Sequence, residues 1–178
     1  MLNLKLSMND LQHVGVKGHG YFCQVKLYRH LITGREFAFK ELKKEHYPKD
    51  EYRYRLTREI NMLKELQGCE HIISLLDYGE DVGKESLWYL MPYAAANLYN
   101  YIRKHNSTLS PKERFAIIDQ VIDAIKYAHE RGILHRDISP NNVLVFFEND
   151  QLVIKVADFG LGKDAESISH YTASSASG

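Results

Sequence analysis

The sequence predicts an α+β fold in two parts, a β-rich part over residues 1–93 and a mainly helical part over 94–178. From Leu11 to Leu42, short β-prone segments alternate with glycine, which is typical of antiparallel strands joined by tight turns. After Ala96 a long segment with a helix-capping signal dominates instead. The change of pattern places the boundary between the two parts near Tyr93–Asn97.

The composition argues against several classes of protein. The chain of 178 residues has 23 lysines and arginines and 23 aspartates and glutamates, so its formal net charge is zero and no basic surface for nucleic acid is indicated. There is no run of about 18 apolar residues, and the two cysteines form no CxxC pair. We expect a cytoplasmic protein that binds neither nucleic acid nor a membrane and holds no structural metal.

Five antiparallel strands and one helix are expected before the boundary. Turns between the first strands are predicted at the glycine-containing positions Gly18, Gly20 and Thr33-Gly34. A helical pattern runs from about Pro48 to Gln67, with an apolar stripe made of Leu56, Ile60, Leu63 and Leu66. Two β-prone segments, His71–Gly79 and Ser86–Tyr93, complete the predicted sheet.

The second part contains a long helix that begins with a capping box. Ser110 is the cap, Pro111 occupies the first turn and Glu113 lies three residues after the cap. The helix ends at Gly132, and its apolar stripe consists of Phe115, Ile118, Val121, Ile122 and Ile125. Two strands joined by a turn at Glu148–Asp150 are expected after it: Asn142–Phe147 and Gln151–Asp158.

A lysine in the third strand and a glutamate in the first helix are candidates for an ion pair. Strand alternation in Phe37–Lys40 places Ala38 and Lys40 on one face and both phenylalanines on the other. Glu59 shares the apolar stripe of its helix, and a buried carboxylate costs free energy unless a cation meets it. Lys40 is the natural partner. Two alternatives remain open: a solvated Lys40, and a Glu59 that pairs with Arg55 one turn earlier.

The segment ILHRDISPNNVLV (Ile133–Val145) concentrates polar side chains between aliphatic ends. Its Asp137 can accept a proton from an incoming hydroxyl. Asn142 and Asp158 offer hard oxygens, which suit Mg²⁺ carrying the phosphates of a nucleotide. The glycines of GHGYFCQV (Gly18–Val25) would let backbone N–H groups approach a phosphate, although two glycines between strands alone indicate only a hairpin.

Together these motifs resemble those of the eukaryotic-type protein kinases, in their serine/threonine-like form. The matching residues are Gly18, Gly20 and Val25, then Phe37-Ala38-Phe39-Lys40, Glu59, His135-Arg136-Asp137, Asn142 and Asp158-Phe159-Gly160. The resemblance runs from about residue 11 to the end. It implies a protein-kinase-like bilobal fold, with an N-lobe over 1–93 and a partial C-lobe over 94–178 that is truncated within the activation segment.

The resemblance implies transfer of the γ-phosphoryl group of ATP to a serine or threonine of a protein substrate. Lys40, paired with Glu59, would hold the α- and β-phosphates. Asn142 and Asp158 would hold Mg²⁺, and Asp137 would orient the acceptor hydroxyl as the catalytic base. Adenine would be surrounded by Val25, Ala38, Met91 and Leu144, and the hinge residues Met91, Tyr93 and Ala94 would read its edge.

Four positions depart from the family pattern. Ser139 stands where serine/threonine kinases usually carry a lysine that meets the γ-phosphate, and Lys163 is a candidate to compensate for the missing charge. Cys23 replaces the third loop glycine, Lys17 replaces a commonly aliphatic residue, and Pro92 has no backbone donor in the hinge. Because the base, the metal ligands and the lysine remain, we expect reduced or differently supported activity rather than none.

The resemblance also implies a missing C-terminal part, because kinases of this family continue through an Ala-Pro-Glu motif and several further helices. The apolar stripe of the helix after Ser110 is therefore expected to be open to water. Arg136 would grip a phosphate on the activation segment. The candidate acceptors are Thr172, Ser174, Ser175 and Ser177, with Tyr171 less favoured and a serine-rich linker as the alternative.

Two other functions remain open. The first is a pseudokinase that acts as a scaffold or allosteric partner; Ser139 favours it, whereas the intact site residues argue against it. The second is a small-molecule phosphotransferase of kinase-like fold. The combination of His135-Arg136-Asp137 with Asp158-Phe159-Gly160 is more typical of protein kinases than of that class.

Overall fold

The computed structural model describes residues 7–161, 163 and 164, and the chain divides into two compact units. The first unit comprises Met1–Ile60 and Ser74–Tyr93, and the second comprises Asn61–Ile73 and Ala94–Gly178. Both the observed and the expected division fall after Tyr93, but residues 61–73 group with the second unit. The candidate phosphate acceptors at 171–177 lie outside the described residues.

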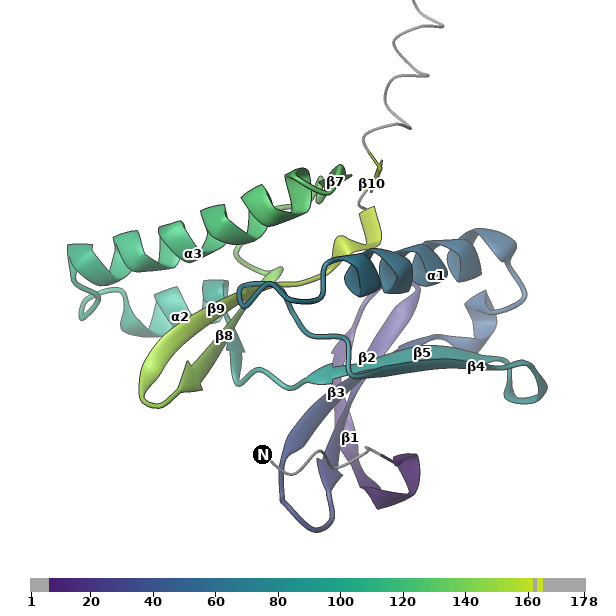
Figure 1. Cartoon of the computed structure of the whole chain (residues 1–178). Coiled ribbons are helices and arrows are strands. Elements are labelled where there is room, and N and C mark those ends of the chain that lie inside the picture. The colour runs from purple at the N-terminus through teal and green to yellow at the C-terminus, as the bar shows by residue number, and fades with distance from the viewer. Residues whose placement is uncertain (1–6, 162, 165–178) are drawn as a thin grey trace, which may run out of the picture. The chain divides into compact units, whose positions relative to one another are not determined.

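A five-stranded antiparallel sheet forms the framework of the first unit, as predicted (Figure 1). Its order is β1 (Leu11–His19), β2 (Cys23–His30), β3 (Glu36–Leu42), β5 (Ser86–Pro92) and β4 (Asp77–Asp81). One face carries a buried cluster of Leu11, Phe37, Phe39 and Leu90. Ala38 and Lys40 alternate with these phenylalanines, so they lie on the opposite face, as the strand pattern predicted.

The first two hairpins close where the glycines predicted turns. The backbone N–H of Gly20 donates to the carbonyl of Cys23 at 2.9 Å, and that of Gly34 donates to His30 at 2.9 Å. Gly34 has a φ of 69°, in the left-handed region that glycine adopts without steric cost. Because these turns fix the register, Val25 lies opposite both Gly18 and Lys40.

Helix α1 (Asp50–Glu65) carries the predicted apolar stripe. Its leucines and isoleucine, Leu56, Ile60 and Leu63, are at most 3% exposed, and acidic Asp50 and Glu51 occupy the first turn, where the helix dipole favours negative charge. The helix is shorter at both ends than the predicted 48–67. Residues up to Ile60 count with the first unit, and the last turn counts with the second.

The predicted strand over His71–Gly79 is wrong in its first six residues, because β4 begins only at Asp77. In the second unit Ile72 instead forms an isolated parallel bridge with Val156, and the N–H of Ile73 donates to the carbonyl of Val156 at 2.9 Å. Both isoleucines are almost fully buried. The β-prone, apolar character of this segment therefore reflects a short buried contact with the chain at Val156 rather than a strand of the sheet.

Besides the last turn of α1, the described residues of the second unit form helices α2 and α3 and short strands (Figure 1). The helices are α2 (Leu98–His105) and α3 (Pro111–His129). One sheet has the order β6 (Ala96–Asn97), β8 (Val143–Glu148) and β9 (Gln151–Val156), and the other pairs β10 (Lys163–Asp164) with β7 (Ile133–Leu134). Short 3₁₀ helices in the chain are η1 (Met8–Asp10), η2 (Lys44–His46), η3 (Val82–Lys84) and η4 (Phe159–Leu161).

Helix α3 begins with the predicted capping box. The Ser110 hydroxyl accepts from the N–H of Glu113, and the Glu113 carboxylate accepts from the N–H of Ser110 at 2.8 Å. The buried residues of α3 are Ile117, Ala124 and Ala128. Small alanines let this side approach β7 and β9 closely. The predicted stripe lies largely on the exposed side, where Phe115, Ile118 and Ile122 are 66%, 51% and 55% exposed.

Among the described residues, no helix combines the length and the apolar character that a membrane span needs.

Candidate active site

The Lys40 ammonium and the Glu59 carboxylate form a buried ion pair in the first unit. Nζ of Lys40 lies 2.9 Å from both carboxylate oxygens of Glu59. The Glu59 side chain is 0% exposed and that of Lys40 is 10% exposed. The predicted pairing is therefore confirmed. The alternative with Arg55 is wrong, because Arg55 pairs with Glu51 on the exposed side of the helix.

Tyr89 is a member of this group that the sequence analysis missed. Its hydroxyl donates to Oε1 of Glu59 at 2.9 Å, and Nζ of Lys40 lies 5.6 Å from the centre of its ring. Tyr89 stands directly opposite Lys40 in the register of β3 and β5. The sequence did not predict this contact, because a tyrosine in SLWYLMPY is typical of any buried strand and its partners follow only from the register of β3 and β5.

The other predicted nucleotide residues of the first unit share the sheet face of Lys40. Val25 lies opposite Lys40, and Ala38 lies opposite Met91. Cross-strand partners point to the same side of a sheet, so these side chains line one surface. Beyond β5, the N–H of Tyr93 donates to the carbonyl of Glu36 at 3.3 Å, which fixes the chain at the end of the strand.

The glycine-rich turn lies at the β1–β2 end of this face. A Cβ on Gly20 would come within 3.3 Å of the carbonyl oxygen of Cys23, so the backbone there is tighter than most side chains tolerate. Cys23 itself is 5% exposed. Glycine at position 20 therefore allows the close packing of the turn against the main chain of Cys23.

The catalytic-loop candidates form a second group, in the second unit. His135 is buried; its Nδ1 accepts from the N–H of Asp137 at 3.2 Å, so its Nε2 donates to the carbonyl of Ala157 at 2.9 Å. Burial lowers the pKa of His135, which keeps the imidazole neutral. The ring also lies 4.6 Å from that of Phe159. His135 thereby ties the loop of Asp137 to the segment that contains Asp158.

Asn142 holds Asp137 by two hydrogen bonds. Its side-chain nitrogen donates to the backbone carbonyl and to Oδ2 of Asp137, both at 2.9 Å. The backbone carbonyl of Asn142 accepts from the N–H of Ala157 at 2.8 Å, which brings the residue next to Asp158. Arg136 and Asp158 have φ values of 68° and 65°, a left-handed conformation that is uncommon outside glycine and clusters at functional sites.

The donor atoms of this group fit a hard divalent cation. Because Asn142 uses its amide nitrogen toward Asp137, its side-chain oxygen is the atom left to meet a metal. The carboxylate of Asp158, which belongs to an exposed residue, is the second oxygen donor. Mg²⁺ in nucleotide sites is bound by one or two such groups together with phosphates.

The remaining predicted residues are placed as follows. Leu144 lies in β8 and Ala94 follows the boundary, both half-buried in the second unit. The backbone carbonyl of Ser139 accepts from the N–H of Asn142 at 3.0 Å, so Ser139 shapes the loop through its main chain. Lys163 lies opposite Leu134 in the short sheet of β7 and β10.

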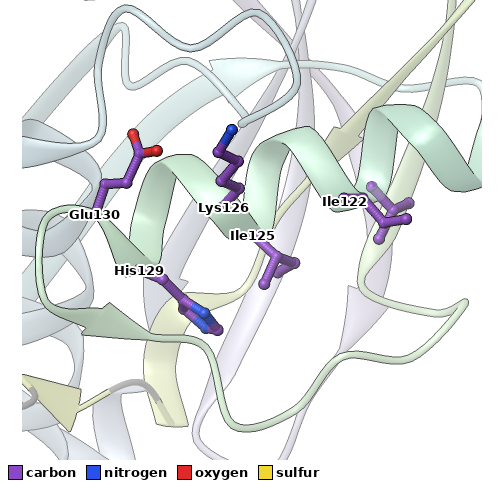
Figure 2. Close-up of a pocket in the computed structure, with 6 residues that line it drawn as sticks. Ile122, Ile125, Lys126, His129 and Glu130 are labelled. Carbon is purple, nitrogen blue, oxygen red and sulfur yellow. The ribbon is translucent and has the colours of Figure 1, made fainter.

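A separate depression of about 680 Å³ lies along α3 and contains none of the predicted site residues. It is lined by Val121, Ile122, Ile125, Lys126, His129 and Glu130. Figure 2 shows Ile125 and His129 projecting from the same side of the helix, one turn apart. Together with the exposed Phe115 and Ile118, this depression forms the exposed apolar side of α3.

Nucleotide-dependent phosphotransferases typically contain two such features. One is a buried ammonium–carboxylate pair on a sheet face, like Lys40 and Glu59, and the other is a loop with an acid and an amide, like Asp137 and Asn142. The sequence matches the family described as protein kinase domain over residues 11–177. The chain therefore belongs to the protein kinase family.

The chain is similar to several kinases over most of its length. It is 36% identical over 165 residues to the carbon catabolite-derepressing protein kinase of Saccharomyces cerevisiae, covering 89% of this chain and 25% of that protein. It is 35% identical over 154 residues to the protein of the same name in Candida glabrata, covering 86% and 24%. It is 33% identical over 155 residues to human 3-phosphoinositide-dependent protein kinase 1, covering 86% and 27%. The chain spans about a quarter of the length of these relatives.

Proposed function

We propose that this chain forms the nucleotide-binding and catalytic part of a protein kinase that transfers the γ-phosphoryl group of ATP to serine or threonine hydroxyls of a protein substrate. Three observations support the proposal: the family membership, the similarity to proteins named as protein kinases, among them the 31% identical serine/threonine-protein kinase PKH2 of Candida albicans, and the two groups of site residues. The observation that carries it is the buried Lys40–Glu59 pair. A cation held at that depth on the face of Ala38 and Met91 suits the phosphates of a nucleotide stacked on that face.

Lys40 would bind the α- and β-phosphates, and Glu59 would orient its ammonium. Val25, Ala38 and Met91 would contact the base, because they share the sheet face of Lys40. The turn between β1 and β2 would offer backbone N–H groups to the phosphates, other than that of Gly20, which donates to Cys23. In the second unit, Leu144 would contact the base, and Tyr93 and Ala94 would form the hinge.

Asp137 would hold the acceptor hydroxyl and take up its proton, since Asn142 fixes the carboxylate through Oδ2 and leaves Oδ1 for the substrate. Asn142 and Asp158 would hold Mg²⁺. When bound with the nucleotide, Mg²⁺ bridges phosphate oxygens and offsets the negative charge of the transferring group. Arg136 would contact a phosphate on the activation segment.

The test is phosphoryl transfer by the full-length protein with Mg²⁺ and ATP labelled at the γ-phosphate. Asp137→Asn is the inactivating variant. Asp150→Asn is the matched control, because Asp150 is an exposed aspartate at the β8–β9 turn whose φ of 63° asparagine also adopts. We expect label on serine or threonine in the parent and in Asp150→Asn, and at least about 100-fold slower labelling in Asp137→Asn.

The same experiment separates the other candidate functions. Label that appears equally in all three proteins, or in none, favours a pseudokinase scaffold. Label that accumulates on an added sugar or lipid headgroup, with none on protein, favours a small-molecule phosphotransferase. Mass spectrometry of the labelled chain locates the modified residues.

We also propose that the exposed apolar side of α3 packs against further polypeptide of the same kinase domain. Phe115, Ile118 and Ile122 are all more than half exposed, and Ile122 also lines the depression along α3 together with Val121 and Ile125. Surfaces of this kind on soluble proteins mark contacts with other polypeptide.

A further inference from the structure

We propose that Tyr89 is a positioning residue for the phosphate-binding lysine: its hydroxyl fixes the Glu59 carboxylate from the sheet, and so keeps the Lys40 ammonium in the position that binds phosphate. The inference rests on the proposed function, because the phosphate contact of Lys40 belongs to that function. Nothing in the kinase motifs assigns a role to Tyr89.

The geometry follows from the pairing of β3 with β5. Lys40 and Tyr89 are direct cross-strand partners, so both side chains rise from the same face of the sheet. The Tyr89 ring lies beside the ammonium, at 5.6 Å from its centre, and the hydroxyl reaches Oε1 of Glu59 at 2.9 Å. Oε1 therefore accepts from both Lys40 and Tyr89, whereas Oε2 accepts from Lys40.

Because it is buried, the Tyr89 hydroxyl donates to Glu59 rather than to water. Tyr89 is 1% exposed and the Glu59 side chain is 0% exposed, so bulk water does not compete for this hydrogen bond. A buried hydroxyl that lost its acceptor would cost free energy, and so would a buried carboxylate that lost a donor. The bond also joins two elements, because Tyr89 lies in β5 and Glu59 lies in α1.

The Tyr89 hydroxyl matters most when phosphate binds to Lys40. The ammonium of Lys40 has three protons, and phosphate oxygens compete with Glu59 for them. The Tyr89 hydroxyl is a neutral donor, so its hydrogen bond to Glu59 persists while the Lys40 ammonium donates to both Glu59 and phosphate. The carboxylate and the α1 turn that carries it therefore keep their place. Without the hydroxyl, binding of phosphate would loosen the pair, and affinity for MgATP would fall.

The matched control is Tyr47. Its hydroxyl donates to Oε1 of Glu80 at 2.8 Å, it is 4% exposed, and it belongs to the same unit. Tyr47→Phe therefore removes a tyrosine–glutamate hydrogen bond from a buried tyrosine ring, and its acceptor Glu80 is an exposed carboxylate that is not the partner of Lys40. Any general loss of stability should appear in both variants, whereas an effect on nucleotide should appear only in Tyr89→Phe.

The first measurement is steady-state phosphorylation by the full-length protein. For Tyr89→Phe we expect KM for MgATP to rise about five- to tenfold with kcat within about twofold of the parent, because one hydrogen bond to a charged group supports ground-state binding of phosphate. Tyr47→Phe should keep the KM of the parent. An unchanged KM in Tyr89→Phe, or an equal rise in both variants, overturns the proposal.

The second measurement needs no activity. Hydrogen–deuterium exchange of the full-length protein without nucleotide should be faster in the turn of α1 around Glu59 for Tyr89→Phe, but not for Tyr47→Phe. Unchanged exchange there overturns the proposal. If Tyr89→Phe fails to fold while Tyr47→Phe folds, Tyr89 has a structural role and the proposal is wrong. If the parent neither binds MgATP nor transfers phosphate, the proposed function is wrong. The exchange measurement still tests whether Tyr89 fixes the turn of α1 around Glu59.

Discussion

The two groups of site residues are held in place by different means. In the first unit Lys40 and Glu59 lie on regular elements, β3 and α1, and both are buried. In the second unit Asp137 and Asp158 are exposed and lie in irregular segments, next to or at residues with left-handed φ. The first group is fixed by strand register and burial of charge, the second by hydrogen bonds from His135 and Asn142 to the main chain and to Asp137.

This difference predicts where a mutation acts. Removing a charge from the first group breaks an ion pair in the protein interior, so stability decreases together with function. Removing a charge from the second group leaves the surrounding backbone bonds intact, so function suffers with little change in stability. The following predictions test that contrast, from the largest expected effect to the smallest.

Asp137→Asn in the full-length protein should lower kcat by about 10²- to 10⁴-fold, the range for loss of a positioned general base. Its urea unfolding midpoint should stay close to that of the parent, because Asp137 is exposed and asparagine can still accept from Asn142. Transfer rates and equilibrium unfolding measure the two effects. A strong loss of stability would show that the second group is also structural.

Glu59→Gln should destabilise the kinase region by about 3 kcal/mol, because it removes the charge of the buried carboxylate that lies 2.9 Å from the Lys40 ammonium. The matched control is Glu51→Gln, which breaks the exposed Glu51–Arg55 pair one to two turns away on the same helix and should cost less than about 1 kcal/mol. Urea unfolding of both variants measures the difference. Equal losses would contradict the assignment of Glu59 to a buried pair.

The pH dependence of stability should reflect the buried His135. Burial lowers its pKa in the folded state, so below the ordinary value of about 6.5 the unfolded chain binds more protons than the folded chain. Stability from this residue is therefore complete above that pH and is lost as pH falls toward the lowered value. His135→Asn should show a shallower loss of stability between neutral and acidic pH than the parent, and urea unfolding of both proteins over that pH range measures the slopes.

Ser139→Lys should leave the protein active, with kcat within about tenfold of the parent. The loop depends on the backbone carbonyl of Ser139 rather than on its side chain, so the substitution preserves the hydrogen bond to Asn142. An added cation near the transferring group is favourable in itself. The check is the transfer rate; an inactive Ser139→Lys beside an active parent would refute the expectation.

The same contrast explains how much the sequence predicted. Alternation in β3 and the 3–4 spacing in α1 are local signals, so the sequence predicted that Lys40 and Glu59 face a common core and pair. Tyr89 could not be found, since its contact depends on the register between strands that are far apart in the chain. The segment from His71 to Leu76 was misassigned because a short apolar run has the same composition in a strand and in an isolated bridge.

In the second unit the loop motifs predicted which residues gather around Asp137, but not how they are held. The left-handed φ at Arg136 and Asp158 has no signal in these residue types. The buried side of α3 was also missed, because Ala124 and Ala128 are weak apolar signals beside Phe115 and the isoleucines. The larger residues were rightly expected to be open to water.

The central proposal is that Lys40 and Asp158 both contribute to the binding of one MgATP. Calorimetric titration of the full-length protein tests it with one variant from each group, Lys40→Met and Asp158→Asn, each with and without Mg²⁺. The account predicts one nucleotide per chain in the parent, weaker binding in both variants, and a dependence on Mg²⁺ that Asp158→Asn loses and Lys40→Met retains. No binding by the parent at saturating MgATP, or binding that one of the two substitutions leaves unchanged, would contradict it.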